Sequence, residues 1–211
     1  MSNIIVQKFG GTSVGSDERI SAVAQIIKNA KKDNQVIVVV SAMSGETNRL
    51  INLAKSFGDN PDRREFDALI STGEKVSASL LAMALNSIGV KAKSFSASQI
   101  SMKTTDHHSK AKIIDLNAEK ILATLNEDIV PIITGFQGVT ESGDVTTLGR
   151  GGSDTTAVAI AAHVNAVRCD IYTDVDGIYT TDPRVVPEAK KLDSITMEEM
   201  LEMAGQGAKV I

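Results

Sequence analysis

The chain has 211 residues, of which 42% are hydrophobic and 23% charged, and its formal net charge is −4. That length suffices for one α/β domain with a sizeable core, and the acidic balance, without a block of lysine and arginine, argues against nucleic-acid binding. The single cysteine, Cys169, excludes an internal disulfide framework and is typical of a reducing compartment, so we expect a cytoplasmic protein. The N-terminus lacks the pattern of a signal peptide, and the longest strongly apolar run, residues 36–40, is too short to span a membrane.

Apolar strands alternate with helical patterns along the chain. Strands are predicted over residues 4–6, 36–40, 92–95, 111–116, 129–134 and 168–173. Helices are predicted over residues 20–30, from residue 46 or 47 onward, over 63–87 with an interruption near Gly73, and over 118–125, 157–164 and 197–203. A turn at residues 142–144 predicts a hairpin. Because strands alternate with helices, we expect a mainly parallel sheet that is covered on both faces.

Small or polar residues follow the ends of four of these strands: Gly10, Ser41, Gly135 and Thr173. In open α/β sheets, ligands bind beyond the carboxyl ends of the strands. The sequence therefore predicts one shared cleft at that edge of the sheet.

Residues 146–157, TTLGRGGSDTTA, form a glycine-rich loop that leads into a helix. Ser153 is the expected N-cap, and Asp154 falls in the first turn, where a carboxylate suits the helix dipole. Glycines let backbone N–H groups approach an anion, and Arg150 adds a rigid fork for a carboxylate or phosphate. A flexible loop before a well-capped helix would explain Ser153 and Asp154 but not Arg150, so we favour an anion site.

Two further motifs are compatible with ligand binding. Lys8 precedes a run of backbone donors at the end of a strand, which suits a polyphosphate; the alternative is a tight turn with an exposed lysine. Neither a Walker A loop nor a Gly-x-Gly-x-x-Gly motif occurs. Glu74 lies in a stretch of otherwise apolar or small residues, where a carboxylate could bind the amino group of a ligand. Taken alone, the motif favours the alternative, an exposed ion pair between Glu74 and Lys75 at the start of a helix.

Other polar residues have simpler interpretations. The segment with Asp174, Asp182 and Arg184 is compatible with a nucleotide, but Asp-Gly and Asp-Pro also favour turns. His107 and His108 lack the pattern of a zinc site and are expected to be solvated, so no protein metal site is predicted. Cys169 is expected in the core rather than as a nucleophile. The last predicted helix has a solvent-exposed face, indicated by Glu198, Glu199 and Glu202.

In this order, the motifs resemble the aspartate kinases, a group within the amino acid kinase family. The motifs that carry the resemblance are KFGGTSV at 8–14, VVSAM at 39–43, GEK at 73–75, TLGRGGSD at 147–154 and TDVDGIY at 173–179. The resemblance implies a three-layer α/β/α sandwich with a mainly parallel central sheet. It also implies that ATP phosphorylates L-aspartate to 4-phospho-L-aspartate, the first step toward lysine, threonine and methionine.

The same resemblance implies roles for individual residues. Lys8 would stabilise the transferred phosphoryl group, and Asp154 would position Lys8 and the Mg²⁺-nucleotide. The remaining ATP-binding residues would be Gly10, Gly11, Ser13, Ser41, Thr173, Asp174, Tyr179, Asp182, Arg184 and Lys209. The aspartate-binding residues would be Thr47, Glu74, Arg150, Gly151, Gly152 and Ser153, with Arg150 on the α-carboxylate and Glu74 on the amino group.

The family continues past the region that ends at Ile211. We therefore expect residues 1–211 to form a kinase catalytic domain truncated at its C-terminal end, without the regulatory ACT domains, from a parent that forms a homo-oligomer. Two alternatives remain open. One is another small-molecule kinase of the same fold, such as an acetylglutamate, glutamate 5- or uridylate kinase. The other is a nucleotide-binding module without turnover.

Overall fold

A computed structural model describes residues 3–175, 177–182 and 185–205. The chain divides into two compact units, residues 1–173 and 174–211. The larger unit contains every strand that forms a sheet in the described residues.

The larger unit is built on a five-stranded sheet in the order β3-β6-β2-β1-β9. Its strands are β1 (Asn3–Phe9), β2 (Asn34–Val40), β3 (Ala92–Phe95), β6 (Val130–Thr134) and β9 (Arg168–Tyr172). All four strand pairs are parallel, which confirms the predicted sheet. The carboxyl ends of β1, β2, β6 and β9 therefore share one edge, as the strand-end residues predicted.

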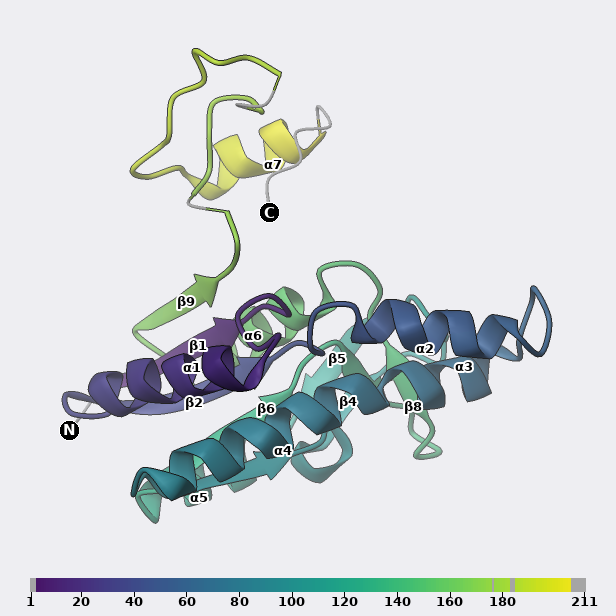
Figure 1. The fold of residues 1–211 in the computed structure, drawn as a ribbon, viewed down its shortest axis with the longest axis horizontal. Helices are drawn as coiled ribbons and strands as arrows, with labels where there is room; N and C mark the ends of the chain where they lie inside the picture. The colour runs from purple at the N-terminus through teal and green to yellow at the C-terminus, as the bar shows by residue number, and fades with distance from the viewer. Residues whose placement is uncertain (1–2, 176, 183–184, 206–211) are drawn as a thin grey trace. The chain divides into compact units, whose positions relative to one another are not determined.

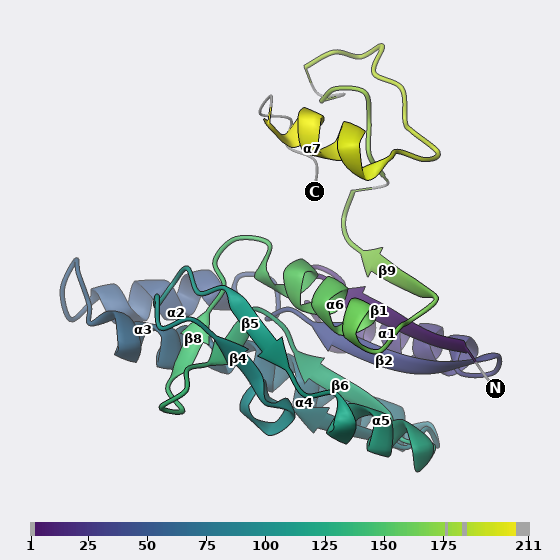
Figure 2. The same ribbon diagram turned by 180° about the vertical axis from the view of Figure 1, so that it is seen from behind.

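Helices cover both faces of this sheet. The helices α1 (Asp17–Ala30) and α4 (Thr72–Ser87) lie over the face turned to the viewer in Figure 1, and α5 (Glu119–Asn126) and α6 (Gly152–His163) lie over the face seen in Figure 2. Helices α2 (Glu46–Lys55) and α3 (Arg63–Ile70) follow one another between β2 and α4, and the short 3-10 helix η1 (Ser98–Ile100) follows β3. The arrangement is the expected α/β/α sandwich.

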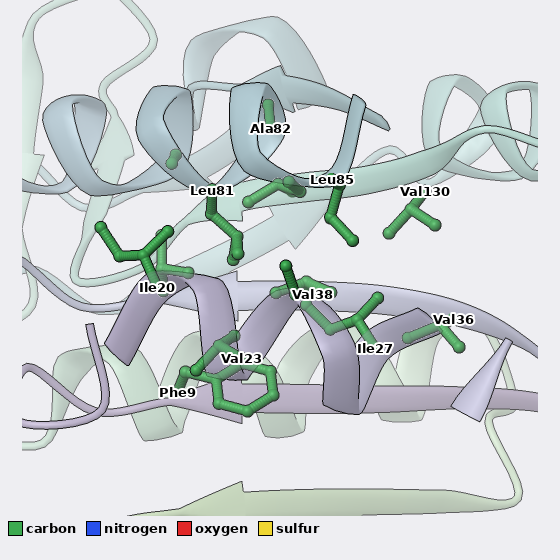
Figure 3. Packing of buried hydrophobic residues seen from close by; sticks show 14 of the residues in the cluster. Phe9, Ile20, Val23, Ile27, Val36, Val38, Leu81, Ala82, Leu85 and Val130 are labelled. Atoms are coloured by element: carbon green, nitrogen blue, oxygen red, sulfur yellow. The ribbon is translucent and has the colours of Figure 1, made fainter. Parts of the chain in front are cut away.

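The period-2 alternation of β2 divides the core into two halves. Val36, Val38 and Val40 face one hydrophobic cluster, whereas Ile37 and Val39 face the other. In the first cluster, side chains of α1 and α4 meet above β2, as the labelled residues in Figure 3 show. Full burial on both faces explains why this strand reads as a continuous apolar run.

A second, four-stranded sheet in the order β5-β4-β7-β8 was not predicted. It consists of β4 (Met102–Thr104), β5 (Ile113–Leu116), β7 (Gln137–Val139) and β8 (Val145–Thr147). The turn at residues 142–144 does join an antiparallel hairpin, β7–β8, so that prediction is confirmed. The strand predicted over residues 111–116 is β5, two residues shorter at its start, whereas β4 was missed because three residues give too short a pattern to distinguish a strand from a loop.

The helical region over residues 63–87 is interrupted, as expected. The break falls at Ser71, between α3 and α4, two residues before Gly73. By length and composition alone this stretch would be apolar enough to cross a membrane, but half of its most apolar window is buried inside the protein. Figure 1 shows α4 packed along the sheet, which is the position of a core helix.

The smaller unit contains a two-strand bridge and one helix in its described part. Tyr179 pairs with Lys191 in an antiparallel bridge that two flanking backbone hydrogen bonds support. Helix α7 (Met197–Gly205) begins with a capping box, in which Thr196 Oγ1 accepts from the Glu199 N–H and the Glu199 carboxylate accepts from the Thr196 N–H. Glu198, Glu199 and Glu202 are exposed, as predicted for the wet face of this helix.

Candidate active site

A pocket of about 250 Å³ lies at the carboxyl edge of the parallel sheet in the larger unit. It is built from the ends of β1, β2 and β6, the starts of α2 and α4, and the loop that leads into α6. The residues that line it are Lys8, Ser41, Ala42, Thr47, Glu74, Phe136, Gly149, Arg150, Gly151, Gly152, Ser153 and Asp154. The structure thus brings together both predicted catalytic residues and all six predicted aspartate-binding residues.

The two predicted catalytic residues form an ion pair in the pocket wall. Lys8 Nζ lies 2.7 Å from Asp154 Oδ1, and the two side chains are 8% and 31% exposed. A lysine as buried as Lys8 is costly without a countercharge, and Asp154, in the first turn of α6, supplies one. The ion pair therefore fixes Lys8 at the end of β1, with the more exposed Asp154 open to the pocket.

The loop before α6 needs glycine at several positions. Gly149 and Gly151 have positive φ angles of 81° and 71°, in the left-handed region that favours glycine. The N-cap is Gly151 and the helix begins at Gly152, so the prediction that Ser153 is the N-cap is wrong. Ser153 lies inside the first turn, where its Cβ would be only 2.7 Å from a Cβ at Gly135. The close approach of α6 to the end of β6 thus moves the helix start two residues earlier than the capping pattern suggested.

Phe136 is a pocket residue that sequence reasoning missed. Its φ angle is 69°, which is rare for a bulky side chain. Two hydrogen bonds hold this conformation: its N–H donates to Thr156 Oγ1 (3.2 Å), and its carbonyl accepts from the Leu148 N–H (2.9 Å). The ring packs so closely on Gly152 that a Cβ there would lie 2.9 Å from Phe136 Cδ2. The sequence did contain one signal for this residue, because Phe136 directly follows Gly135 at the end of a predicted strand.

Glu74 is buried in the first turn of α4, with only 3% of its surface exposed. Its Oε1 accepts from the Ala42 N–H (3.1 Å), whereas its Oε2 is buried and has no hydrogen-bond partner in the described part of the chain. Burial raises the pKa of the Glu74 carboxyl from 4.5 to about 7, against the smaller effect of the Ala42 N–H. The alternative of a surface pair with Lys75 is wrong, and the buried carboxylate points to a cationic ligand group.

Arg150 lies at the exposed rim of the same pocket. Its guanidinium has no ion-pair partner among residues 3–175, 177–182 and 185–205, so its five donors remain available to a ligand. Thr47, half-buried at the start of α2, and Ser41, at the end of β2, complete the polar lining.

The turn after Lys8 does not line this pocket, and two of its amides already have acceptors. The Gly10 N–H donates to the Tyr172 carbonyl and the Ser13 N–H to the Gly10 carbonyl, both at 3.0 Å. In this conformation these two amides hold the turn and are not available as donors to a phosphate, contrary to the expectation. Gly11 is required for packing, because a Cβ there would lie 2.7 Å from the Ala42 carbonyl oxygen.

The remaining predicted nucleotide residues fall elsewhere. Thr173 directly follows β9 and lies next to Gly10, since a Cβ on Gly10 would lie 4.0 Å from the Thr173 Cα. Asp174, Tyr179 and Asp182 belong to the smaller unit. The Asp182 carbonyl accepts from the N–H groups of residues 185 and 186, which is turn geometry. Arg184 and Lys209 lie outside the described residues.

Two residues away from the pocket also test the sequence interpretation. His107 is exposed, but the side chain of His108 is only 18% exposed and contacts the buried Asp67, so the expectation that His108 is solvated is wrong. Cys169 is half-buried against the second hydrophobic cluster, and burial raises the pKa of its thiol. Both features fit a core position for Cys169 rather than a nucleophile.

The fold and the pocket together combine an α/β/α sandwich with a lysine at a strand end and a glycine-rich loop at a helix N-terminus, an arrangement that suits the binding of anions. The model of the amino acid kinase family matches residues 3–211. The chain therefore belongs to the amino acid kinase family.

Individual proteins of known name extend this comparison. The chain is 57% identical to the aspartate kinase of Pseudomonas putida over 209 residues, which cover 99% of this chain and 51% of that protein. It resembles the crystal structure of aspartate kinase from Synechocystis with a TM-score of 0.86 at 49% identity, over 99% of this chain and 34% of that one. It also resembles E. coli aspartokinase III in complex with aspartate and ADP, with a TM-score of 0.87 at 33% identity, over 96% of this chain and 56% of that one. The chain spans about half the length of the curated relatives it matches.

Proposed function

We propose that this chain catalyses phosphoryl transfer from ATP to the side-chain carboxylate of L-aspartate, forming 4-phospho-L-aspartate and ADP. The observation that carries the proposal is the pair of opposite recognition groups in one pocket, the buried Glu74 carboxylate and the exposed Arg150 guanidinium, which has no ion-pair partner in the described part of the chain. Together they match the two charges of a free α-amino acid. The similarity to aspartate kinases, one of which holds aspartate and ADP, supports the same acceptor.

The residues of the pocket suit this reaction without a general base. The acceptor carboxylate has a reference pKa of about 3.9 and is ionised at neutral pH. One of its oxygens attacks the γ-phosphorus, the new O–P bond forms, and the bond to the β,γ-bridging oxygen breaks with its electrons leaving on ADP. No proton moves, so catalysis depends on alignment and on the neutralisation of charge. Lys8 provides the positive charge at the reacting phosphoryl group, and Asp154 fixes Lys8 through their ion pair.

The aspartate would be held by its backbone groups, away from the reacting carboxylate. Arg150 takes the α-carboxylate in a two-point contact, and Glu74 takes the ammonium group through its unpaired Oε2. Thr47 and Ser153 supply hydroxyl groups on the pocket wall, and Gly151 and Gly152 let the loop backbone approach the substrate. This arrangement leaves the side-chain carboxylate directed toward Lys8.

The donor set of the pocket fits Mg²⁺ bound mainly through the nucleotide. In the described part of the chain no group of three or more His, Cys, Asp and Glu residues surrounds a common point, whereas Asp154 presents a partly exposed carboxylate to the pocket. Mg²⁺ prefers one or two carboxylates together with substrate phosphates. When bound, it would neutralise charge on the phosphate oxygens, and Asp154 would hold it.

The proposal extends to the rest of the nucleotide and to the context of the protein. Ser41, Gly11 and Thr173 would surround the phosphates, and the segment with Asp174, Tyr179, Asp182, Arg184 and Lys209 would hold the nucleoside. Residues 1–211 would act as a kinase catalytic domain in the cytoplasm, within a homo-oligomeric parent that carries ACT domains, as in the resemblance described above. The single, half-buried Cys169 supports a reducing compartment.

The test is ATP-dependent acyl phosphate formation on L-aspartate, trapped with hydroxylamine as the hydroxamate. We expect hydroxamate that requires ATP, Mg²⁺ and L-aspartate together. L-glutamate, N-acetyl-L-glutamate and uridine monophosphate serve as competing acceptors in a coupled ADP assay. Turnover with one of these and not with aspartate would identify another small-molecule kinase, and ATP binding with no turnover on any acceptor would identify a nucleotide-binding module.

A further inference from the structure

Asp67, in α3, is a fully buried carboxylate that does not line the pocket. Its two oxygens accept hydrogen bonds from three residues on two distant segments. Oδ1 accepts from the hydroxyl groups of Ser109 (3.1 Å) and Thr147 (2.8 Å), and Oδ2 from the N–H groups of the same residues, at 2.8 Å and 2.9 Å. His108 Nδ1 lies 3.1 Å from Oδ2. We define these four residues as the Asp67 cluster.

The cluster lies at the entrance of the loop that carries Arg150. Thr147 ends β8, three residues before Arg150, and both its N–H and its hydroxyl are bound to Asp67. The next residue, Leu148, donates its N–H to the Phe136 carbonyl. Ser109, from the same cluster, touches the loop as well, because its carbonyl oxygen would lie 3.3 Å from a Cβ at Gly149. The start of the Arg150 loop is therefore anchored on a buried charge.

The same helix end leads to the other recognition group of the pocket. The Ser71 N–H donates to the Asp67 carbonyl (3.1 Å), and the Ser71 carbonyl accepts from Gln137 Nε2 (2.9 Å). Helix α4 begins directly after Ser71 and carries Glu74 in its first turn. The Asp67 side chain thus ties the loop of Arg150 to the segment from which Glu74 projects.

We propose that Asp67 is a positioning residue for the acidic substrate, which fixes the spacing between Arg150 and Glu74 without contacting the substrate. A buried carboxylate is costly unless its oxygens are fully hydrogen-bonded, so the five contacts of Asp67 define one arrangement of the loop. Side-chain hydrogen bonds that hold a recognition loop act on substrate binding more than on the nucleotide. The proposal rests on the function proposed above.

The first test is the isosteric variant Asp67→Asn in steady-state kinetics. The asparagine side chain has nearly the same volume, but its NH₂ group takes the place of one carboxylate oxygen. Because this group cannot accept hydrogen bonds, the hydrogen bonds that this oxygen accepts are lost. We expect the KM for L-aspartate to rise about tenfold or more, the KM for ATP to stay within about twofold, and kcat to fall only a few-fold. Equal increases in both KM values, or no change in the KM for aspartate, would overturn the positioning role.

A matched pair at Thr147 keeps the test decisive if Asp67→Asn does not fold. Thr147→Val removes the hydroxyl donor at nearly constant shape, whereas Thr147→Ser retains it. We expect Thr147→Val to raise the KM for aspartate several-fold and Thr147→Ser to restore a value close to that of the unmodified chain. Ser109→Ala removes a donor from the other segment and should change the melting temperature more than this KM. Equal KM values for the Val and Ser variants would contradict the proposal.

Amide hydrogen exchange separates this proposal from the proposed function. In Asp67→Asn, we expect the segment 145–152 to exchange about tenfold faster while β2 is unchanged, whether or not the chain phosphorylates aspartate. If the unmodified chain shows no aspartate kinase activity but this segment loses protection, the proposed function fails and the anchoring of the loop stands. Unchanged protection of 145–152 refutes the anchoring.

Discussion

The pocket contains two carboxylates in contrasting environments. Asp154 is partly exposed and lies 2.7 Å from Lys8, so its charge is compensated within the protein. Glu74 is almost fully buried, accepts one N–H from Ala42 and has a second oxygen without a partner in the described residues. In the proposed function, Asp154 would position the catalytic lysine and Glu74 would bind the cationic group of the substrate. A pre-paired charge fixes a catalytic lysine, and an unpaired buried charge becomes favourable only when a cation arrives.

The largest expected loss of activity comes from variants that break the ion pair between Lys8 and Asp154. Lys8→Ala removes the cation at the reacting phosphoryl group, and we expect kcat to fall by about 10³-fold or more while the circular dichroism spectrum stays unchanged. Asp154→Ala should have a comparable effect, because it releases Lys8. Lys75→Ala, on the exposed surface next to Glu74, is the control and should keep full activity. Near-normal turnover in either active-site variant would refute the assignment.

Variants of Glu74 and Arg150 should change the KM for aspartate and leave the KM for ATP unchanged. Glu74→Gln keeps an acceptor for the Ala42 N–H but removes the charge, and we expect the KM for aspartate to rise about 100-fold with the KM for ATP unchanged. Arg150→Ala should raise the same KM by a similar factor. Glu119→Gln, at an exposed position in the first turn of α5, is the matched control. If neither Glu74→Gln nor Arg150→Ala changes the KM for aspartate, these two residues do not bind the substrate.

The raised pKa of Glu74 predicts how the free energy of unfolding changes with pH. Because the folded-state pKa is about 7 and the usual value is 4.5, the unfolded chain releases this proton more readily, and the fold loses stability as pH rises from about 4.5 to 7. Glu74→Gln removes this loss, so we expect it to match the unmodified chain near pH 4 and to exceed its free energy of unfolding above pH 7, by at most about 3 kcal/mol. Urea titrations at several pH values measure this. A difference that is constant with pH would contradict the raised pKa.

The same titration predicts how substrate binding depends on pH. Aspartate needs the ionised form of Glu74, so its affinity should rise with pH up to about 7 and then level off. In Glu74→Gln this rise should be absent. Calorimetric titration with aspartate at pH 6, 7 and 8 distinguishes the two behaviours.

The smallest effect concerns Phe136, the pocket residue with a positive φ angle. At Phe136, with its φ of 69°, glycine should be more stable than alanine by about 1 kcal/mol, because alanine keeps the strain and glycine relieves it. At the exposed Phe57, whose φ is not positive, alanine should be the more stable of the two. Thermal unfolding of the four variants makes the test, and the same order at both positions would exclude strain at Phe136.

Much of the site followed from rules that act along the chain. The strand-end rule predicted a cleft at the carboxyl edge of the parallel sheet, and Ser41 is the one of the four residues named for it that lines the pocket. The helix pattern after residue 157 predicted the first turn that carries Asp154. The Ser153 cap failed because the close approach of α6 to Gly135 is a tertiary contact, which a local capping pattern does not contain.

The residues that sequence reasoning missed depend on long-range contacts. Asp67 has its hydrogen-bond partners 41 to 80 positions along the chain, and the only local signal was a charged residue on the same helix face as the buried Ile70. His108 was misread for the same reason, because its neighbours in sequence are polar and its contact comes from α3. The burial of Glu74 beneath Ala42 likewise required the turn after β2 to be placed first.

The position of β1 has a consequence for how the chain folds. β1 pairs with β2 on one side and with β9 on the other, so Lys8 has Val39 and Ile171 as its neighbours in the sheet. Stacking of Phe9 on Tyr172, with ring centroids 4.5 Å apart, closes the same junction. Contacts between such distant parts of a chain form slowly, because a long loop must close first. During synthesis, Lys8 therefore leaves the ribosome long before Asp154 and meets it only after the chain between them has followed, so their ion pair forms late in the assembly of the larger unit.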